Sequence, residues 1–135
     1  MSLGRWKVKL RKSDTLFSHY IREKNNWTCQ ICGKYCGENN NLGKLEASHF
    51  YGRGRENTRM DEDNVVSLCF RCHNSYGHGE NRPAYESFMK KKLGQEGFDL
   101  LTIRANTYKK RDDIMDLIII ENMIKELKAK ETLNP

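Results

Sequence analysis

The chain has 135 residues, of which 37% are hydrophobic and 31% charged, and its formal net charge is +6. This length fits one domain with a hydrophobic core. With so polar a composition, burial of apolar side chains alone would give only marginal stability, and we expect the cysteines to supply an additional cross-link. The longest apolar run covers only residues 117–120 and we find no secretion signal, so we expect a cytoplasmic protein with no membrane partner.

The positive charge is concentrated in the first half of the chain. Residues 1–60 carry 12 Lys and Arg against 5 Asp and Glu, whereas residues 61–135 carry 12 against 13. A localised positive surface suits a polyanion, because neutralised phosphates release their counterions. DNA is therefore a candidate partner, although many basic proteins bind no nucleic acid.

The first third of the chain predicts one helix followed by an irregular segment. Ser13 is a favoured N-cap, and four apolar residues at helical spacing follow before the helix ends near Lys24. These four residues are Leu16, Phe17, Tyr20 and Ile21. Residues 29–43 are rich in Gly and Asn and predict a cysteine-containing turn followed by a loop.

Two short strands are predicted next. Residues 45–51 form the first strand, residues 52–63 a charged and turn-rich loop, and residues 65–69 a second strand with β-branched side chains. We expect the two strands to pair antiparallel.

Helices dominate the remainder of the chain. A helix after Cys72 is expected to break at residues 77–79, and another begins at Pro83 and ends at Gly94. The second of these is expected to bury Tyr85, Phe88, Met89 and Leu93. Two more amphipathic helices are predicted from apolar residues at helical spacing, namely Phe98, Leu101, Ala105 and Tyr108, then Leu117, Ile120, Ile124 and Leu127. The last helix packs on the chain's own core or, alternatively, forms a homodimer contact.

Four of the five cysteines form two C-x-x-C pairs, Cys29 with Cys32 and Cys69 with Cys72. In a reducing compartment this spacing indicates a metal site, the alternative being four unrelated free thiols. Two such turns complete a tetrahedral Zn²⁺ site with Zn–S bonds of about 2.3 Å, and that closed site is structural, contributing roughly 10 kcal/mol to folding. The fifth cysteine, Cys36, is expected to be a spare and partly exposed thiol, with a role as substitute ligand as the alternative.

Candidates for catalysis lie between and just after the two cysteine pairs. His49 lies on the first predicted strand, Asn64 precedes the second, and His73 follows Cys72 directly. Because one zinc ion would hold the two pairs together, we expect both imidazoles to face one phosphate. Phosphodiester hydrolysis needs a base for the attacking water and a cation for the phosphate charge. His49 fits the base, and His73 fits a ligand of a divalent metal.

This ordered set resembles the HNH, or ββα-metal, endonucleases in their zinc-containing branch. The set is Cys29, Cys32, His49, Asn64, Cys69, Cys72 and His73. The resemblance implies an α+β fold with a small ββα-metal core and a four-cysteine zinc site, preceded by one helix and followed by two or three. It also implies that His49 is the general base, that Asn64 holds the loop of the base, and that His73 binds catalytic Mg²⁺ or Mn²⁺.

A narrower similarity, to phage NinG recombination proteins, covers roughly residues 13–115. It is carried by residues 46–55, 61–64, 69–73 and Tyr85. The similarity implies a role in phage or prophage DNA recombination, with branched DNA as one candidate substrate. We divide the chain into an N-terminal extension that allows for a cloning remnant, a nuclease core and a helical tail, at residues 1–12, 13–94 and 95–135.

Ser48 departs from the HNH pattern, because many of these enzymes have Asp or His there as a second metal ligand. A neutral hydroxyl is a poor ligand for a hard cation, so we expect the metal to be held mainly by His73, water and DNA phosphate. His78 is a further candidate ligand, although it lies between two glycines that indicate a flexible turn.

Three arginines follow the predicted base and are expected to contact DNA phosphates, the alternative being an ordinary solvated loop. They are Arg53, Arg55 and Arg59. The main rival to a nuclease is a non-catalytic zinc-stapled module that binds DNA or a protein. That rival explains the cysteines and the charge, but not the order of His49, Asn64 and His73. A nuclease acting on RNA is a third possibility.

Overall fold

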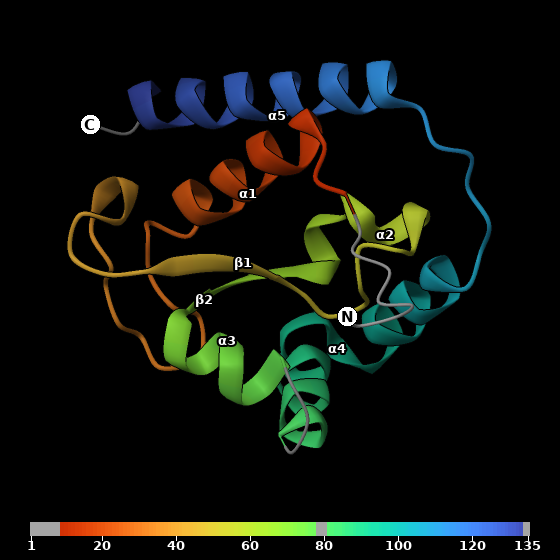
Figure 1. Ribbon diagram of the computed structural model, residues 1–135, viewed down its shortest axis with the longest axis horizontal. Helices are drawn as coiled ribbons and strands as arrows, with labels where there is room; N and C mark the ends of the chain where they lie inside the picture. The colour runs from red at the N-terminus through yellow and green to blue at the C-terminus, as the bar shows by residue number, and fades with distance from the viewer. Residues whose placement is uncertain (1–8, 78–80, 134–135) are drawn as a thin grey trace, which may run out of the picture.

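The computed structural model describes residues 9–77 and 81–133, which form a mixed α+β fold around a two-stranded antiparallel sheet (Figure 1). The strands are β1 (Leu45–His49) and β2 (Val65–Cys69). The helices are α1 (Lys12–Lys24), α2 (Glu56–Arg59), α3 (Phe70–Gly77), α4 (Arg82–Ala105) and α5 (Asp113–Leu133), with short 3₁₀ turns at η1 (Glu38–Asn40) and η2 (Glu62–Asn64). The predicted α+β class and antiparallel pairing are confirmed.

The register of the hairpin places a cysteine at one end of the sheet and a histidine at the other. Leu45 pairs with Cys69 at one end, and His49 pairs with Val65 at the other. β2 covers the predicted residues, whereas β1 stops at His49 rather than at Tyr51. One more hydrogen bond follows in the same register, from the backbone N–H of Phe50 to the carbonyl of Asn64 at 2.9 Å, before the two chains separate.

Helices cover both faces of this hairpin. On one face α1 packs beneath α5, and a buried cluster joins Phe17 and Ile21 of α1 to Ile120 of α5. On the other face, Val66 and Leu68 of β2 belong to a larger cluster with the buried side chains of Tyr85, Met89, Phe98 and Leu101 from α4. Each such apolar side chain contributes about 1.5–3 kcal/mol when fully buried, so the two clusters fix the hairpin between the helical layers.

The start of α1 differs from the prediction. Arg11, not Ser13, is the N-cap, and Ser13 is only 2% exposed. The Asp14 carboxylate accepts a 2.8 Å hydrogen bond from the backbone N–H of Arg11, which satisfies a donor of the first turn. The predicted apolar stripe is largely correct, since Phe17, Tyr20 and Ile21 are buried.

The helices after β2 also differ in their limits. α3 begins at Phe70, directly after β2, and ends at Gly77, the first residue of the predicted break, whose residues 78 and 79 lie outside the described residues. The helices predicted on either side of Gly94 follow each other within α4, which changes direction where Gly94 adopts a φ of +75°. Tyr108 was expected in the core but is 87% exposed, because α4 ends at Ala105.

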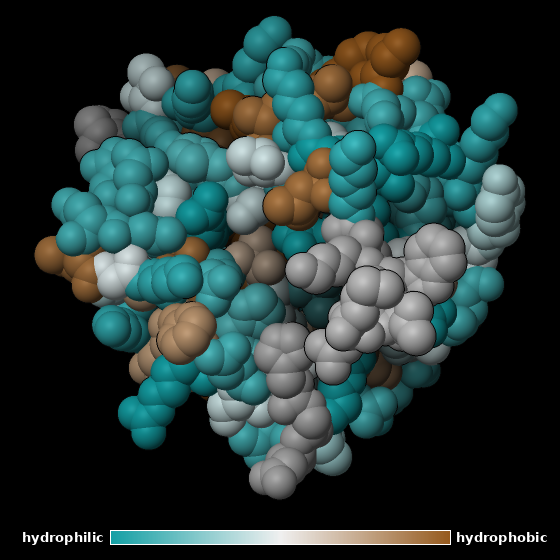
Figure 2. Space-filling view, in the orientation of Figure 1, coloured by the Kyte–Doolittle hydropathy of each residue, from teal (hydrophilic) through white to brown (hydrophobic). Residues whose placement is uncertain are grey.

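α5 is only partly covered by the rest of the chain. Ile120 is buried against α1, whereas Ile114, Met115, Ile118 and Ile119 are exposed. Hydrophobic side chains gather along the upper edge of the molecule, where α5 runs (Figure 2). None of the described helices combines the length and the apolar character that a bilayer span requires.

Candidate active site and metal centre

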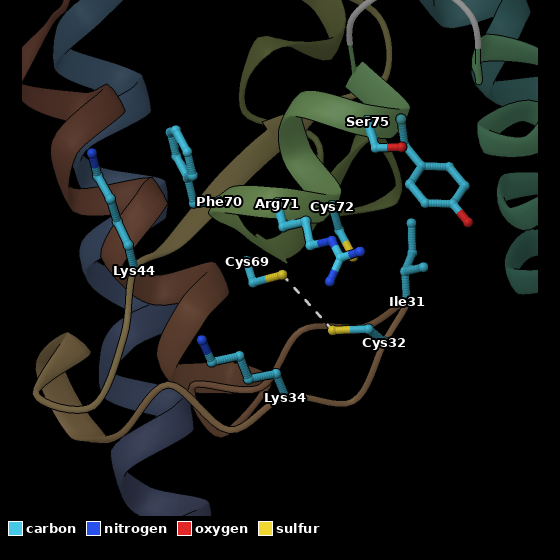
Figure 3. A pocket seen from close by; sticks show the side chains of 10 residues that line it. Ile31, Cys32, Lys34, Lys44, Cys69, Phe70, Arg71, Cys72 and Ser75 are labelled. Atoms are coloured by element: carbon cyan, nitrogen blue, oxygen red, sulfur yellow. Dashed lines mark hydrogen bonds between the residues drawn. The ribbon is translucent and has the colours of Figure 1, made fainter.

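The four paired cysteines converge beside the Cys69 end of the hairpin. Figure 3 shows three of them, Cys32, Cys69 and Cys72. Their Sγ atoms lie within 4.8 Å of one another, and those of Cys32 and Cys69 are 3.7 Å apart. Four Zn–S bonds of about 2.3 Å in a tetrahedron place sulfur atoms about 3.8 Å apart. The cluster therefore has the size and chemistry to hold one structural metal ion such as zinc.

A tight turn presents the first cysteine pair. The carbonyl of Cys29 accepts a 2.9 Å bond from the N–H of Gly33, and the N–H of Cys29 donates to the carbonyl of Lys34 at 2.9 Å. Gly33 has a φ of +79°, a conformation that residues with a Cβ adopt at a cost. This reversal turns the Cys32 thiol back toward that of Cys29.

Hydrogen bonds attach this turn to the strand that carries Cys69. The N–H of Gln30 donates to the carbonyl of Ser67, and the Gln30 side chain accepts from the N–H of Ser67 at 3.1 Å. The Ser67 hydroxyl also donates to the carbonyl of Thr28 at 2.9 Å. The two cysteine pairs are thus brought together by protein contacts as well as by their shared site.

The surroundings of the Cys29 and Cys72 thiols shift their pKa values in opposite directions. Burial raises the pKa of Cys29, but backbone N–H groups of Cys32, Cys69 and Ile31 outweigh it and lower the pKa to about 7. Burial raises the pKa of the Cys72 thiol. A thiolate is the form that binds metal, so Cys29 is prepared to ligate near neutral pH.

Cys36 is not the partly exposed thiol that we predicted. Its side chain is 0% exposed and belongs to the core cluster on the α4 side. The chain doubles back over it, since the N–H of Leu42 donates to the carbonyl of Cys36 and Gly43 packs next to its sulfur. Cys36 lies outside the four-thiol group.

His49 is the last residue of β1, and its ring is held by one hydrogen bond. Nε2 lies 2.9 Å from the carbonyl oxygen of Arg59. A carbonyl only accepts, so Nε2 carries the proton and Nδ1 of the neutral ring keeps its lone pair. Burial, together with the positive charge of Arg53, lowers the pKa of His49 to about 4. The ring is therefore neutral at neutral pH.

Asn64 fastens the loop that follows His49. Its side chain is 0% exposed, and its Nδ2 donates to the carbonyls of Tyr51 and Thr58 at 2.9 and 3.0 Å. Its Oδ1 accepts from the N–H of Tyr51 at 2.8 Å. Three hydrogen bonds of a buried side chain thus join the residue before β2 to both ends of the loop after β1.

His73 lies on α3 against the other face of β1. Its Nδ1 is 3.4 Å from a carboxylate oxygen of Glu46. One turn later, a Cβ at Gly77 would lie 3.0 Å from the His73 ring and 3.9 Å from the Ser48 hydroxyl. Glu46, Ser48 and His73 therefore gather where α3 crosses β1. We had assigned no role to Glu46, yet the two-residue period of a strand places it on the same face as Ser48.

Ser48 is used in packing rather than exposed to a ligand. It is 1% exposed, and its hydroxyl lies 2.8 Å from that of Tyr85 on α4. Burial raises the pKa of Tyr85 to about 12, so the phenol stays protonated at neutral pH. The hydroxyl pair ties α4 to β1.

The arginines of the predicted phosphate loop have separate environments. Arg59 is 2% exposed, and its guanidinium donates to the Asp14 carboxylate and to the carbonyls of Lys9 and Arg53. Arg59 therefore joins α2 to α1. We expected it to contact DNA phosphates, but its side chain is buried. Arg55 donates to the carbonyl of Ala105 at 3.2 Å and so covers the end of α4.

Arg53 remains the best placed of the three for an anion. Its charge acts on His49, and its Nε is buried without a hydrogen-bond partner in the part of the chain that the structure describes. A buried donor without a partner is costly, so this guanidinium is suited to an incoming acceptor such as a phosphate oxygen.

A family model described as Bacteriophage Lambda NinG protein matches residues 2–132. The chain belongs to the NinG family. No curated protein and no solved structure gave a significant match. The narrower of the two similarities drawn from the sequence is thus confirmed.

The two candidate histidines of this NinG-family chain lie on opposite faces of β1. Strand alternation places His49 on the side of α1 and α2, whereas His73 packs on the side of Glu46 and Ser48. Their surroundings come closest at the end of β1, where Ser48 precedes His49 and neighbours Gly77. Any shared substrate would have to lie there. The further candidate, His78, lies outside the described residues.

Proposed function

We propose that this NinG-family chain is a metal-dependent DNA endonuclease of the HNH type that acts in phage or prophage recombination. Zinc in the four-thiolate site would be structural, and His49 would be the general base. The main support is the set of three hydrogen bonds between the buried Asn64 side chain and the backbone of Tyr51 and Thr58, which we call the Asn64 clasp. These bonds hold the loop that directly follows His49. Such a clasp orients a base by holding the backbone on which it is mounted.

The proposed base acts through Nδ1. Because Nε2 donates to the carbonyl of Arg59, Nδ1 is the atom that can take the proton of a water molecule. A pKa of about 4 keeps this atom unprotonated but makes it a weak base. A phosphate bound near Arg53 would offset the positive charge that depresses the pKa, and would raise it toward the working pH.

Glu46 and His73 are the groups that would hold the catalytic Mg²⁺ or Mn²⁺. Their side chains already lie 3.4 Å apart, and the carboxylate oxygen of Glu46 suits these hard cations. When bound, the metal supplies positive charge that stabilises the phosphate and the leaving oxygen. Ser48 contributes no ligand in this scheme, because its hydroxyl is paired with Tyr85.

A second candidate function is a zinc-stapled DNA-binding module without hydrolysis. One observation favours it: Ser48 and Gly77, which lie next to His73, offer no strong ligand, so Glu46 is the acidic group of the described residues that lies beside His73. In that case His49 would serve only to hold α2 to β1 through the carbonyl of Arg59.

A plasmid cleavage assay tests the proposal. Zinc-loaded protein is incubated with supercoiled plasmid and with branched DNA, with Mg²⁺ or Mn²⁺ or without either ion. We expect ion-dependent cleavage that His49→Ala lowers by about 10²–10⁴-fold, the contribution typical of a general base. His19→Ala is the matched control, since His19 is an exposed histidine on α1. Cleavage that survives in His49→Ala removes the assignment of the base.

Glu46→Gln tests the metal site separately. The amide keeps the shape but loses the charge, so we expect a higher Mn²⁺ concentration for half-maximal cleavage with unchanged zinc content. Exposed Glu86→Gln on α4 is the control. Bound Mn²⁺ should also broaden the NMR signals of the His49 ring, because paramagnetic relaxation requires proximity. Sharp His49 signals beside broadened His73 signals would place the two groups in different sites.

A further inference from the structure

A second surface feature lies beside the four thiols and has no part in the proposed cleavage. It is a pocket of about 830 Å³, a size typical of sites that enclose small ligands. Its lining includes Ile31, Lys34, Lys44, Phe70, Arg71 and Tyr76. We call it the α3 pocket, because α3 supplies most of one wall (Figure 3).

The charged side chains of the α3 pocket are all positive, and their three charges exceed the net charge of −2 of a zinc ion with four thiolates, three of which (Cys32, Cys69 and Cys72) also line the pocket. Lys34, Lys44 and Arg71 are exposed, and no acidic residue of the described chain lines the pocket. None of these three cations forms an ion pair with a described residue, whereas Arg59 of α2 and Arg104 of α4 do. Three unpaired cations around one hollow create a potential that attracts an anion.

Two aromatic rings accompany these cations. Phe70 is 52% exposed although it is the first residue of a helix with a buried face, and Tyr76 is half-buried. The ammonium of Lys44 lies 5.2 Å from the centroid of the Phe70 ring. Six residues of helix separate the two residues by about 9 Å along the axis and by about 120° around it, so the rings lie on different parts of the pocket wall.

We propose that the α3 pocket binds an unpaired stretch of DNA, with bases stacked on Phe70 and Tyr76 and phosphates held by Lys34, Lys44 and Arg71. Aromatic faces between cations are the means by which proteins bind single strands without reading sequence. Paired bases keep their faces inside the duplex, so this pocket selects unpaired nucleotides. The inference rests on the proposed function only in taking DNA as the ligand. It places that strand on the same helix as His73.

Fluorescence anisotropy on the zinc-loaded full chain, without Mg²⁺ or Mn²⁺, tests the α3 pocket. The probes are a short labelled oligothymidine and a blunt duplex. We expect Phe70→Ala to bind oligothymidine about tenfold more weakly and to bind the duplex almost unchanged, because one stacking surface is lost. Phe70→Trp should restore the affinity. Tyr108→Ala removes an aromatic ring that is 87% exposed elsewhere and should change neither affinity.

A salt series separates the cations from the rings. Lys44→Ala should reduce the slope of log K against log salt concentration by about 0.7, the value for one phosphate contact on a single strand. Phe70→Ala should leave that slope unchanged. Lys91→Ala, an exposed lysine on α4, is the matched control and should keep the wild-type slope.

Two results would overturn the inference. One is unchanged oligothymidine affinity in both Phe70→Ala and Tyr76→Ala, with zinc content and circular dichroism as in the wild type. The other is displacement of oligothymidine by polyglutamate with an equal dependence on Phe70, which would assign the pocket to an acidic protein segment. Cleavage and binding remain distinguishable, because His49→Ala should bind oligothymidine normally. Binding that depends on Phe70 in a chain that cuts no DNA would retain the α3 pocket and refute the nuclease.

Discussion

The two ends of the central hairpin are held by different means. Where Leu45 pairs with Cys69, four thiols surround a site that fits a metal ion. Where His49 pairs with Val65, the side chains of Asn64 and Arg59 hold the chain through buried hydrogen bonds and a pair with Asp14. One end therefore offers a site that an ion from solution can fill, and the other is held by groups that the chain itself supplies.

This difference predicts how each end fails. A thiolate site without its metal loses most of its stabilising free energy at once, because the ligands then repel one another or protonate. A buried polar network fails one group at a time, and each loss leaves the remaining partner unsatisfied. The following substitutions test this contrast, in order of expected effect.

The largest effect is expected for Cys69→Ser at the metal end. Loss of one thiolate should abolish tight zinc binding and cost on the order of 10 kcal/mol, so the domain should not fold. Zinc analysis and circular dichroism measure this directly. Cys36→Ala is the matched control, because Cys36 is a buried cysteine outside the four-thiol group and should keep the zinc. Equal zinc content and melting in Cys69→Ser would refute a structural metal site.

Arg59→Ala at the other end should cost about 3–5 kcal/mol, because it leaves the Asp14 carboxylate buried and unpaired. Urea unfolding at neutral pH gives the free energy, and zinc content should remain normal in the folded fraction. The control is Arg111→Ala, whose partner Asp113 is exposed, and it should leave stability unchanged. Similar losses in both variants would mean that the buried pair has no special role.

A pH dependence of stability should come from His49. Its folded pKa of about 4 lies below the ordinary value of 6.5, so the unfolded chain binds the proton first as the pH falls. The folded state should therefore lose about 3 kcal/mol between pH 6.5 and pH 4, and no stability from this group should be lost above pH 6.5. His49→Gln should lack this component when both proteins are unfolded in urea across the range. Parallel curves for the two proteins would contradict it.

Asn64→Ala should have the smallest effect on stability of this series, about 2 kcal/mol, because solvent can reach part of the loop once the clasp is lost. Its effect on cleavage should be larger, since the loop carrying the proposed base is no longer fixed. Asn74→Ala, an exposed asparagine on α3, is the control. A variant with lowered stability but full cleavage would show that the clasp supports the fold and not the base.

Local patterns explain the predictions that were correct. The residues of β2 and the apolar stripe of α1 follow from short-range periodicity, since a strand or helix must turn its apolar side to the core. The cysteine cluster follows from two pairs with metal-binding spacing. Gly94 was correctly expected to interrupt a helix, because glycine readily adopts the positive φ found there.

The errors concern residues whose role depends on partners far along the chain. Arg59 was predicted to contact DNA, but its partner Asp14 is 45 residues away. Cys36 was predicted to be partly exposed, but residues 42 and 43 fold over it. Glu46 was passed over because only the docking of α3 brings His73 to within 3.4 Å of it.

The family, the two strands and the two cysteine pairs can be read from the order and spacing of residues along the chain. Which charged groups are buried and which face solvent follows only from how the folded chain packs. That choice depends on desolvation, which is set by whatever the fold packs around a side chain and not by its neighbours in sequence. For this reason Arg59 holds two helices together while Arg53, six residues earlier, retains an unpartnered donor beside the proposed base.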